Sequence, residues 1–503
     1  MSIIQGTSKA AGGDHTIDQS ARFNDGDSPE LSRTYTLSAP WTFSAWVKRC
    51  ELGAANILLG TSGSSPEVQF NSGDTITAEG LTTTAVFRDP AAWYHVHVSD
   101  NGLYINGVSY GSVTTTSLTN AKLFDDFDGY AAEVHLQSGT SAYTNFGVTN
   151  AGTGEWVPKA ATAGDTYLKF ANSSDFGENS GTGGAWTASG LTSADQMLDT
   201  PTLNAATLNP LWAGAGLSDG NLVATATGNS YQRAISTFAI DDGGKYACEF
   251  QKSSGTFGYV GLYQLGNHTA TTGNNYGYFY NLGTGEIIKN SSVVTDLGTG
   301  AANSLMRLEY DSATDTLEFF DDGVSIYSAT TGLTGQNSLH FGCAPFGSGT
   351  KITATFQGLS GTPTADFLEL TSANLDDPTI ADPSAHMQTT LYTGTGSSLA
   401  VTQSGNSTFQ PDWVWIKGRS GATEHVLTDA VRGVTKELSS NDTGVEETVA
   451  QGLTTFGSAG FTVGTDGSYN TSSATYVGWQ WKANGAGSSN TDGSITSTVS
   501  NNS

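Results

Sequence analysis

One short supersecondary unit occurs twice in this chain and constrains its fold more than any other feature. In the first copy, the side chains of residues 93–98 alternate between two sets. This period of two is typical of a strand whose two faces meet different surroundings. A turn at residues 100–102 follows, in which Asn and Gly tolerate positive φ. A second strand, a tight turn at Asn106-Gly107 and a third strand complete the unit.

The second copy spans residues 306–327 and has the same order of strand, turn and strand, with Asp322-Gly323 at its second turn. A three-stranded meander cannot bury its apolar face by itself. Each copy therefore predicts a β-sandwich around it, so the chain is expected to contain at least two sandwiches.

The composition agrees with a β protein that has many turns. The chain has 503 residues, which predicts three or four domains, and 63 of these residues are glycine. Charged residues make up only 13% of the chain, against roughly 25% in average proteins. No convincing amphipathic helical period is present. The expected fold class is all-β.

The charge and the cysteines exclude several classes of function. The net charge is −27 and the 20 Lys and Arg residues are scattered, so nucleic acid is not an expected partner. No run approaches the roughly 20 apolar residues of a membrane span, and no secretory signal is visible. Cys50, Cys248 and Cys343 lie far apart, which predicts reduced, buried thiols in a protein assembled in cytoplasm.

Flanking segments give each copy a resemblance to a known family. The first copy, with PWTFSAWVKR at residues 40–49 and DGYAAEVHL at 128–136, resembles a laminin G-like or concanavalin A-like lectin domain. The second copy, with GGKYACEF at 243–250 and GYVGLYQLG at 258–266, resembles a SPRY-like domain, which is also a concanavalin-type sandwich. With the β module that follows, the order of modules resembles large structural proteins of tailed bacteriophages.

The expected architecture is a set of tandem β-sandwiches of the concanavalin A-like jelly-roll type, joined by connectors rich in Gly, Ser, Thr and Pro. The predicted divisions are an N-terminal arm that attaches to the virion (1–18), a laminin G-like sandwich (19–171), a linker or draped segment (172–201), a SPRY-like sandwich (202–358), a connector (359–386), a small β module of phage-fibre type (387–483), and a linker or the start of a further module (484–503).

The resemblance implies a structural component of a tailed-phage virion, of the tail-fibre or spike type, assembled in the host cytoplasm. Its expected partners are two further copies of itself in a homotrimer, other tail or baseplate proteins, and a bacterial surface receptor, with a glycan among the candidates. A head-fibre or capsid-associated protein, a polysaccharide depolymerase and a host-encoded extracellular lectin remain alternatives.

Enzymatic activity is not expected. A retaining glycosidase needs two carboxylates about 5–5.5 Å apart, and the Glu-x-Asp-x-x-Glu strand motif usual for this sandwich is absent. No Gly-x-Ser-x-Gly elbow, His-Glu-x-x-His motif or P-loop is present.

Aromatic side chains are the candidates for glycan binding, because an aromatic ring offers a sugar a rigid apolar face. The candidate residues are Trp93, Tyr276, Tyr278 and Tyr280. Packing in a core or between domains explains the same residues more simply. Burial at a module core or a subunit contact is the expectation for Trp413, Trp415, Trp479 and Trp481.

Carboxylates before one strand suggest a site for Ca²⁺, which takes 6–8 oxygen ligands. The candidate ligands are Asp125, Asp126 and Asp128, and laminin G-like domains often bind Ca²⁺ near one rim. A solvated loop explains this cluster more simply. His95 and His97 share a strand face and would suit a metal, although a polar outer face is the simpler interpretation.

Overall fold

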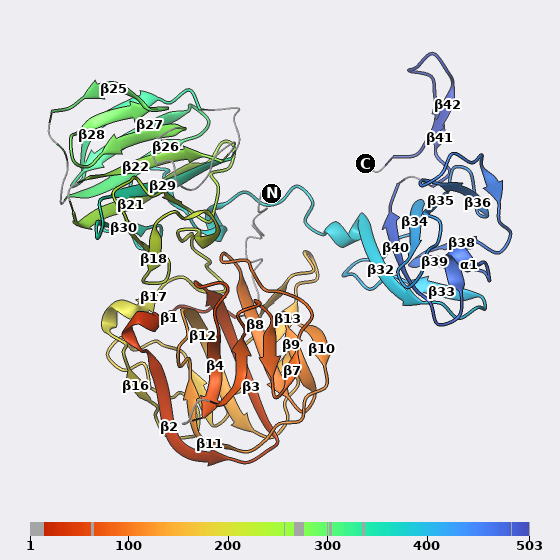
Figure 1. Ribbon diagram of the computed structural model, residues 1–503, viewed down its shortest axis with the longest axis horizontal. Helices are drawn as coiled ribbons and strands as arrows, with labels where there is room; N and C mark the ends of the chain where they lie inside the picture. The colour runs from red at the N-terminus through yellow and green to blue at the C-terminus, as the bar shows by residue number, and fades with distance from the viewer. Residues whose placement is uncertain are drawn as a thin grey trace. The chain divides into compact units, whose positions relative to one another are not determined.

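The computed structural model describes residues 15–61, 65–255, 257–265, 276–298, 300, 304–333, 338–483 and 485–501. Antiparallel sheets account for most of the secondary structure, which confirms the all-β fold class (Figure 1). The chain divides into two compact units, one within Met1–Val148 and Trp156–Asp377 and the other within Thr149–Glu155 and Pro378–Ser503. The first unit contains two sandwiches. Residues 1–14 of the predicted arm lie outside the described residues.

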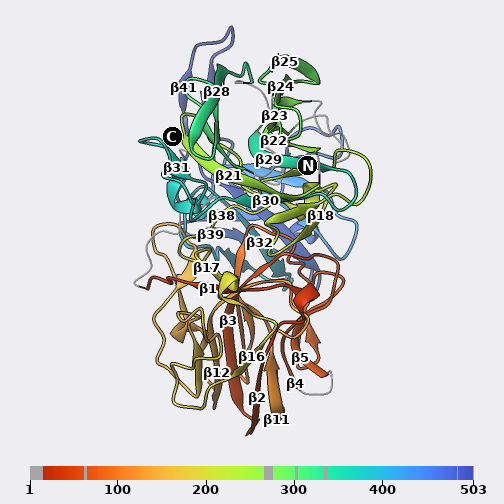
Figure 2. The ribbon, with the colours of Figure 1, turned by 90° about the vertical axis from the view of Figure 1, so that its left-hand side faces the viewer.

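The first sandwich consists of two sheets that can be followed in Figures 1 and 2. The first sheet has the order β10 (Val108–Gly111), β9 (Gly102–Ile105), β8 (Trp93–Ser99), β3 (Trp41–Arg49), β12 (Gly129–Ser138), β1 (Ser20–Phe23) and β17 (Gln196–Met197), with β15 (Thr166–Leu168) on β12. The second has the order β16 (Thr187–Ser189), β2 (Glu30–Leu37), β11 (Leu118–Leu123), β4 (Asn56–Thr61), β5 (Ser65–Phe70), β6 (Ile76–Ala78) and β7 (Leu81–Thr82). A short hairpin, β13 (Gly147–Thr149) and β14 (Trp156–Pro158), follows.

Alternation along the strands decides what this sandwich buries. In β3, Phe43, Ala45 and Val47 enter the core between the sheets, as the sequence pattern predicts. The opposite face of the same strand presents Trp46 and Lys48, which are also buried. Because both faces of this sheet are covered, the first sheet is a central layer of the unit.

Residues 172–201, predicted as a linker or draped segment, belong to the first sandwich. β16 pairs with β2, and β17 pairs with β1. Phe176 and Trp186 lie in the core with exposed fractions of 3% each. The polar composition of this segment suggested a connector, but its strand pairing and the burial of its aromatic side chains make it part of the sandwich.

The second sandwich also has two sheets. One has the order β18 (Gly216–Ser218), β19 (Val223–Thr225), β30 (Lys351–Thr355), β21 (Lys245–Ser254), β26 (Leu305–Asp311), β27 (Thr316–Asp321) and β28 (Val324–Thr330), with β31 (Leu368–Glu369) parallel to β21. The other has the order β20 (Ala234–Ile235), β29 (Leu339–Phe346), β22 (Phe257–Gln264), β23 (Gly277–Asn281), β24 (Glu286–Lys289) and β25 (Ser292–Asp296).

The first part of the predicted connector 359–386 is likewise part of this sandwich. Leu370 and Leu375 lie in its core. The buried carboxylate of Glu249 accepts hydrogen bonds from the backbone N–H groups of Ser360 and Gly361, at 2.8 and 3.0 Å. Unit 1 therefore continues to Asp377.

A buried polar cluster joins the two sandwiches of the first unit. Lys48 Nζ donates to Asp199 Oδ2, Asn204 Oδ1 and the carbonyl of Ala205, at 2.7–2.8 Å. Trp93 Nε1 donates to the other oxygen of Asp199 at 3.0 Å. The Lys48 side chain is 0% exposed. A buried ammonium needs this full set of partners, so the contact holds the sandwiches in one geometry.

The second unit is a small β module. One sheet has the order β32 (Met387–Thr393), β40 (Thr475–Trp481), β34 (Trp413–Gly418), β35 (Val426–Asp429), β36 (Lys436–Ser439) and β37 (Glu447–Thr448), and the other has the order β33 (Leu399–Thr402), β39 (Gly460–Val463) and β38 (Leu453–Gly457). The short helix α1 (Gly467–Asn470) precedes β40, and a hairpin of β41 (Ser488–Asn490) and β42 (Ser497–Val499) follows. Within the described ranges, no helix has the length and apolar character needed to cross a membrane.

Candidate functional site

The aromatic residues predicted to bind glycan do not form a surface. Tyr278 and Tyr280 point into the core of the second sandwich and are 2% and 1% exposed. Trp93 is buried against the polar cluster that joins the sandwiches. Only Tyr276, just before β23, is substantially exposed, at 46%. The prediction of a shared sugar-binding face is wrong, because strand β23 turns that face toward the opposite sheet.

Substitutions of the two tyrosines test this placement. Tyr278→Ala removes a ring from a packed core, so the free energy of unfolding is expected to fall by about 3–5 kcal/mol. Tyr276→Ala is expected to change it by less than about 0.5 kcal/mol, as for other surface positions. Urea denaturation of the two variants measures the difference, and equal effects would contradict the placement.

The predicted calcium ligands do not converge. Asp125 Oδ2 accepts from Lys122 Nζ at 3.2 Å, and Asp126 is exposed in a left-handed conformation, with φ 57°. Asp128 is buried, and burial raises its pKa to about 7, helped by Asp25. Across the part of the chain that the structure describes, no group of three or more His, Cys, Asp or Glu residues is arranged to hold a metal.

His95 and His97 lie on a buried polar layer, together with His135 of β12. Trp156 Nε1 donates to His95 Nδ1 at 3.0 Å, so the proton of His95 lies on Nε2, which is 2.8 Å from Ser44 Oγ. Burial lowers the pKa of His95 far below its ordinary range, that of His97 to about 4 and that of His135 to about 3. These imidazoles are neutral packing groups, and the expected polar outer face is covered.

The three cysteines are buried and form no disulfide. Burial raises the pKa of the Cys50, Cys248 and Cys343 thiols, so none is a reactive thiolate near neutral pH.

The second unit contains an aromatic surface that the sequence analysis assigned to a core or a subunit contact. We name it the tryptophan face, and it consists of Trp413 and Trp415 of β34 with Trp479 and Trp481 of β40. The rings of Trp413 and Trp481 stack with centroids 4.4 Å apart, and those of Trp415 and Trp479 lie 5.2 Å apart. Trp413 is 39% exposed and the other three are partly exposed.

The core of this module lies on the other face of the same sheet. Val414 and Ile416 alternate with the two tryptophans of β34 and are 1% exposed, packed with Phe461 and Tyr476. A strand has two faces, and the smaller aliphatic residues occupy the inner one. The expectation of a core position for the tryptophans is therefore wrong. The alternation Trp-Val-Trp-Ile predicts that the tryptophans share one face of the strand, but it does not predict which face lies in the core.

Polar and apolar groups extend the tryptophan face across neighbouring strands. Met387 and Thr389 of β32 pair with Trp481 and Trp479, and both are exposed. Lys417 follows Trp415 on the same face of β34, and its ammonium donates to the Gly418 carbonyl at 3.2 Å. The face therefore combines indole rings with nearby hydroxyl and ammonium groups.

The fold defines a multi-sandwich β protein, and comparisons with known proteins add limited detail. Residues 382–503 match the model of a domain of unknown function, DUF7483. No curated protein matches the chain.

Several solved structures are similar in fold. The SPRY domain of human HERC1 has 15% identity and a TM-score of 0.27, with 30% of this chain and 99% of that chain covered. The TRIM65 PSpry domain has 13% identity and a TM-score of 0.26, covering 31% and 93%. Stonustoxin has 12% identity and a TM-score of 0.24, covering 30% and 28%. At these TM-scores the likeness supports no inference about ligands or partners.

Proposed function

We propose that this chain is a structural component of a tailed-phage virion, of the tail-fibre or spike type, and that its tryptophan face contacts polysaccharide on the host surface. The observation that carries the proposal is the exposure of paired indole rings on a sheet face whose opposite side already forms the module core. A soluble module gains nothing in its own stability from leaving tryptophans at its surface. Their exposure favours a role in binding.

The chemistry of the face favours a sugar over an aliphatic partner. Indole rings offer rigid apolar faces to the C–H groups of a pyranose. Tryptophan is enriched at binding interfaces, because its ring is apolar and its N–H group is polar. The nearby hydroxyl of Thr389 and ammonium of Lys417 are suited to sugar hydroxyl groups. Low affinity at one face is offset when several copies in a virion bind together.

The first unit fits the role of a rigid spacer in this proposal. Lys48 of the first sandwich, held by its ion pair with Asp199, donates to Asn204 and Ala205 of the second, and Tyr130 donates to the Gly220 carbonyl at 2.7 Å.

Adsorption competition tests the proposal. Purified full chain is added to cells of the host before the phage that encodes it, and phage adsorption is expected to fall. The double variant Trp413→Ala/Trp481→Ala is expected to need at least about thirtyfold more protein for the same effect, because each ring is a binding hot spot.

The matched control is Val445→Ala, a residue of the same module that is 83% exposed and lies outside the tryptophan face. It is expected to compete like the unchanged chain. If the folded chain has no effect on adsorption, host-surface binding is wrong. If the double variant instead dissociates an oligomer in light scattering, the face is a subunit contact and the glycan assignment is wrong.

A further inference from the structure

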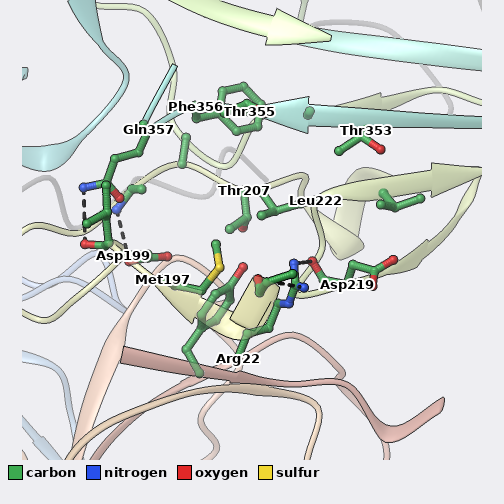
Figure 3. Close-up of a pocket in the computed structure, with 18 of the residues that line it drawn as sticks. Arg22, Met197, Asp199, Thr207, Asp219, Leu222, Thr353, Thr355, Phe356 and Gln357 are labelled. Atoms are coloured by element: carbon green, nitrogen blue, oxygen red, sulfur yellow. Dashed lines mark hydrogen bonds between the residues drawn. The ribbon is translucent and has the colours of Figure 1, made fainter. Parts of the chain in front are cut away.

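A cavity of about 390 Å³, open to solvent, lies between the two sandwiches of the first unit. Its walls come from β1 and β12 of the first sandwich, from residues 194–207 and 219–223, and from the segment that begins at Thr353 in β30 (Figure 3). This volume lies in the range of roughly 300–1,000 Å³ that small-molecule sites occupy. Volume alone does not identify a ligand. The chemical groups that line the cavity indicate which class of ligand it would bind.

Arg22 and Asp199 of the walls are bonded to charged residues outside the cavity lining. Arg22 Nε and Nη2 both donate to Asp195 Oδ1, at 3.1 and 2.7 Å. Asp199 accepts from Lys48 and Trp93. The charged residues that line the cavity are two carboxylates, Asp199 and Asp219, and one cation, Arg22, in a chain with a net charge of −27. An anionic ligand is therefore disfavoured.

Neutral hydrogen-bonding groups face the cavity. The hydroxyl of Thr207 is buried and has no hydrogen-bond partner among the described residues. Thr353 and Thr355 project from the outer face of β30, where Ile352 and Ala354 occupy the inner one. Figure 3 shows Thr207, Thr353 and Thr355 around the same cavity. The hydroxyls of Thr353 and Thr355 are half-buried and available to a ligand, whereas the hydroxyl of Thr207 is shielded from the cavity.

Two glutamines add acceptors of fixed orientation. Gln196 Nε2 donates to the Phe170 carbonyl at 2.8 Å, and Gln357 Nε2 donates to the Leu198 carbonyl at 3.2 Å. Each bond uses the amide nitrogen and orients the side-chain oxygen. Met197 supplies an apolar patch in the same wall.

From these features we infer that the cavity is a binding site for a neutral sugar of one or two rings. Threonine hydroxyls and glutamine amides suit sugar hydroxyls, the apolar patch suits the C–H face of the ring, and the excess of carboxylates rejects acidic sugars. The inference does not rest on the proposed function, because the cavity and the tryptophan face belong to different units.

Titration of the full chain with sugars tests the inference by isothermal calorimetry and saturation-transfer NMR. The probes are D-glucose, D-galactose, N-acetyl-D-glucosamine and maltose, with N-acetylneuraminic acid as the anionic probe. At least one neutral sugar is expected to bind, and the anionic sugar is not.

Thr355→Tyr places a ring in the cavity from a half-buried strand position and is expected to weaken binding by at least about tenfold. Thr330→Tyr is the matched control on the exposed edge strand β28 and is expected to bind as the unchanged chain does. Thr353→Val removes only a half-buried hydroxyl of the cavity wall and serves if the tyrosine variant does not fold.

Three outcomes would overturn the inference. These are no saturable binding of any neutral sugar, binding that survives both Thr355→Tyr and Thr353→Val, and binding that is lost only in Trp413→Ala/Trp481→Ala. The last outcome would support the tryptophan face alone. Sugar binding through the cavity together with failed adsorption competition would uphold this inference while the proposed function fails.

Discussion

Asp199→Ala is expected to lower the free energy of unfolding of the first unit by about 3–5 kcal/mol. The variant leaves the Lys48 ammonium buried, 0% exposed, with no counterion, and it removes the acceptor of Trp93 Nε1. A buried charge without its partner is costly, and this cost is expected to be the largest effect of the variant on the contact between the two sandwiches. Urea denaturation followed by intrinsic fluorescence measures the change.

Two further variants show whether the charge is the cause. Glu446→Ala removes an exposed carboxylate that lies 3.9 Å from Lys436, and it is expected to change stability by less than about 1 kcal/mol. Lys48→Met/Asp199→Leu removes both charges and is expected to recover part of the loss. An Asp199→Ala variant as stable as the Glu446→Ala control would show that the ion pair does not hold the joint.

The first unit is expected to lose stability steeply in mild acid. The pKa of His97 is lowered to about 4 and that of His135 to about 3, while unfolded histidine titrates near 6.5. The unfolded chain therefore binds protons that the folded chain does not, and the free energy of unfolding falls as the pH drops below about 6.5. Each histidine contributes roughly 1.4 kcal/mol per pH unit until its folded pKa is reached.

One buried carboxyl opposes this trend. The pKa of Asp128 is raised to about 7, so its folded form holds a proton that the unfolded form releases above about 4. Stability from this group increases as the pH falls from about 7 to about 4. Between about pH 6 and about pH 4, His97 and His135 act against this one carboxyl, so the net loss is roughly 1.4 kcal/mol per pH unit, and His95 adds to it.

Calorimetry between about pH 7 and about pH 5 measures this dependence. His97→Gln is expected to reduce the pH dependence of the free energy of unfolding by the contribution of one histidine, roughly 1.4 kcal/mol per pH unit. His425→Gln, which removes an imidazole in the second unit, is expected to leave the transition of the first unit unchanged. A slope that His97→Gln does not alter would mean that other groups cause the acid sensitivity.

The repeated strand-turn-strand unit by itself determined the all-β class and the presence of at least two sandwiches. A period of two and Asn-Gly or Asp-Gly turns are local properties, since they depend only on neighbouring residues. That Phe43, Ala45 and Val47 share one face of their strand was predictable for the same reason. Segment ends were less predictable, because Trp186 and Leu370 reach their cores across polar stretches that resemble linkers.

Only the tertiary structure decided which faces are covered. The alternation of Tyr278 and Tyr280 says that they share a face, and so does that of Trp413 and Trp415, but the first pair lies in a core and the second at a surface. The buried bond between Lys48 and Asp199 joins residues 151 positions apart, which no local pattern encodes. Burial depends on what packs against a strand from elsewhere in the chain, whereas the period of a strand does not.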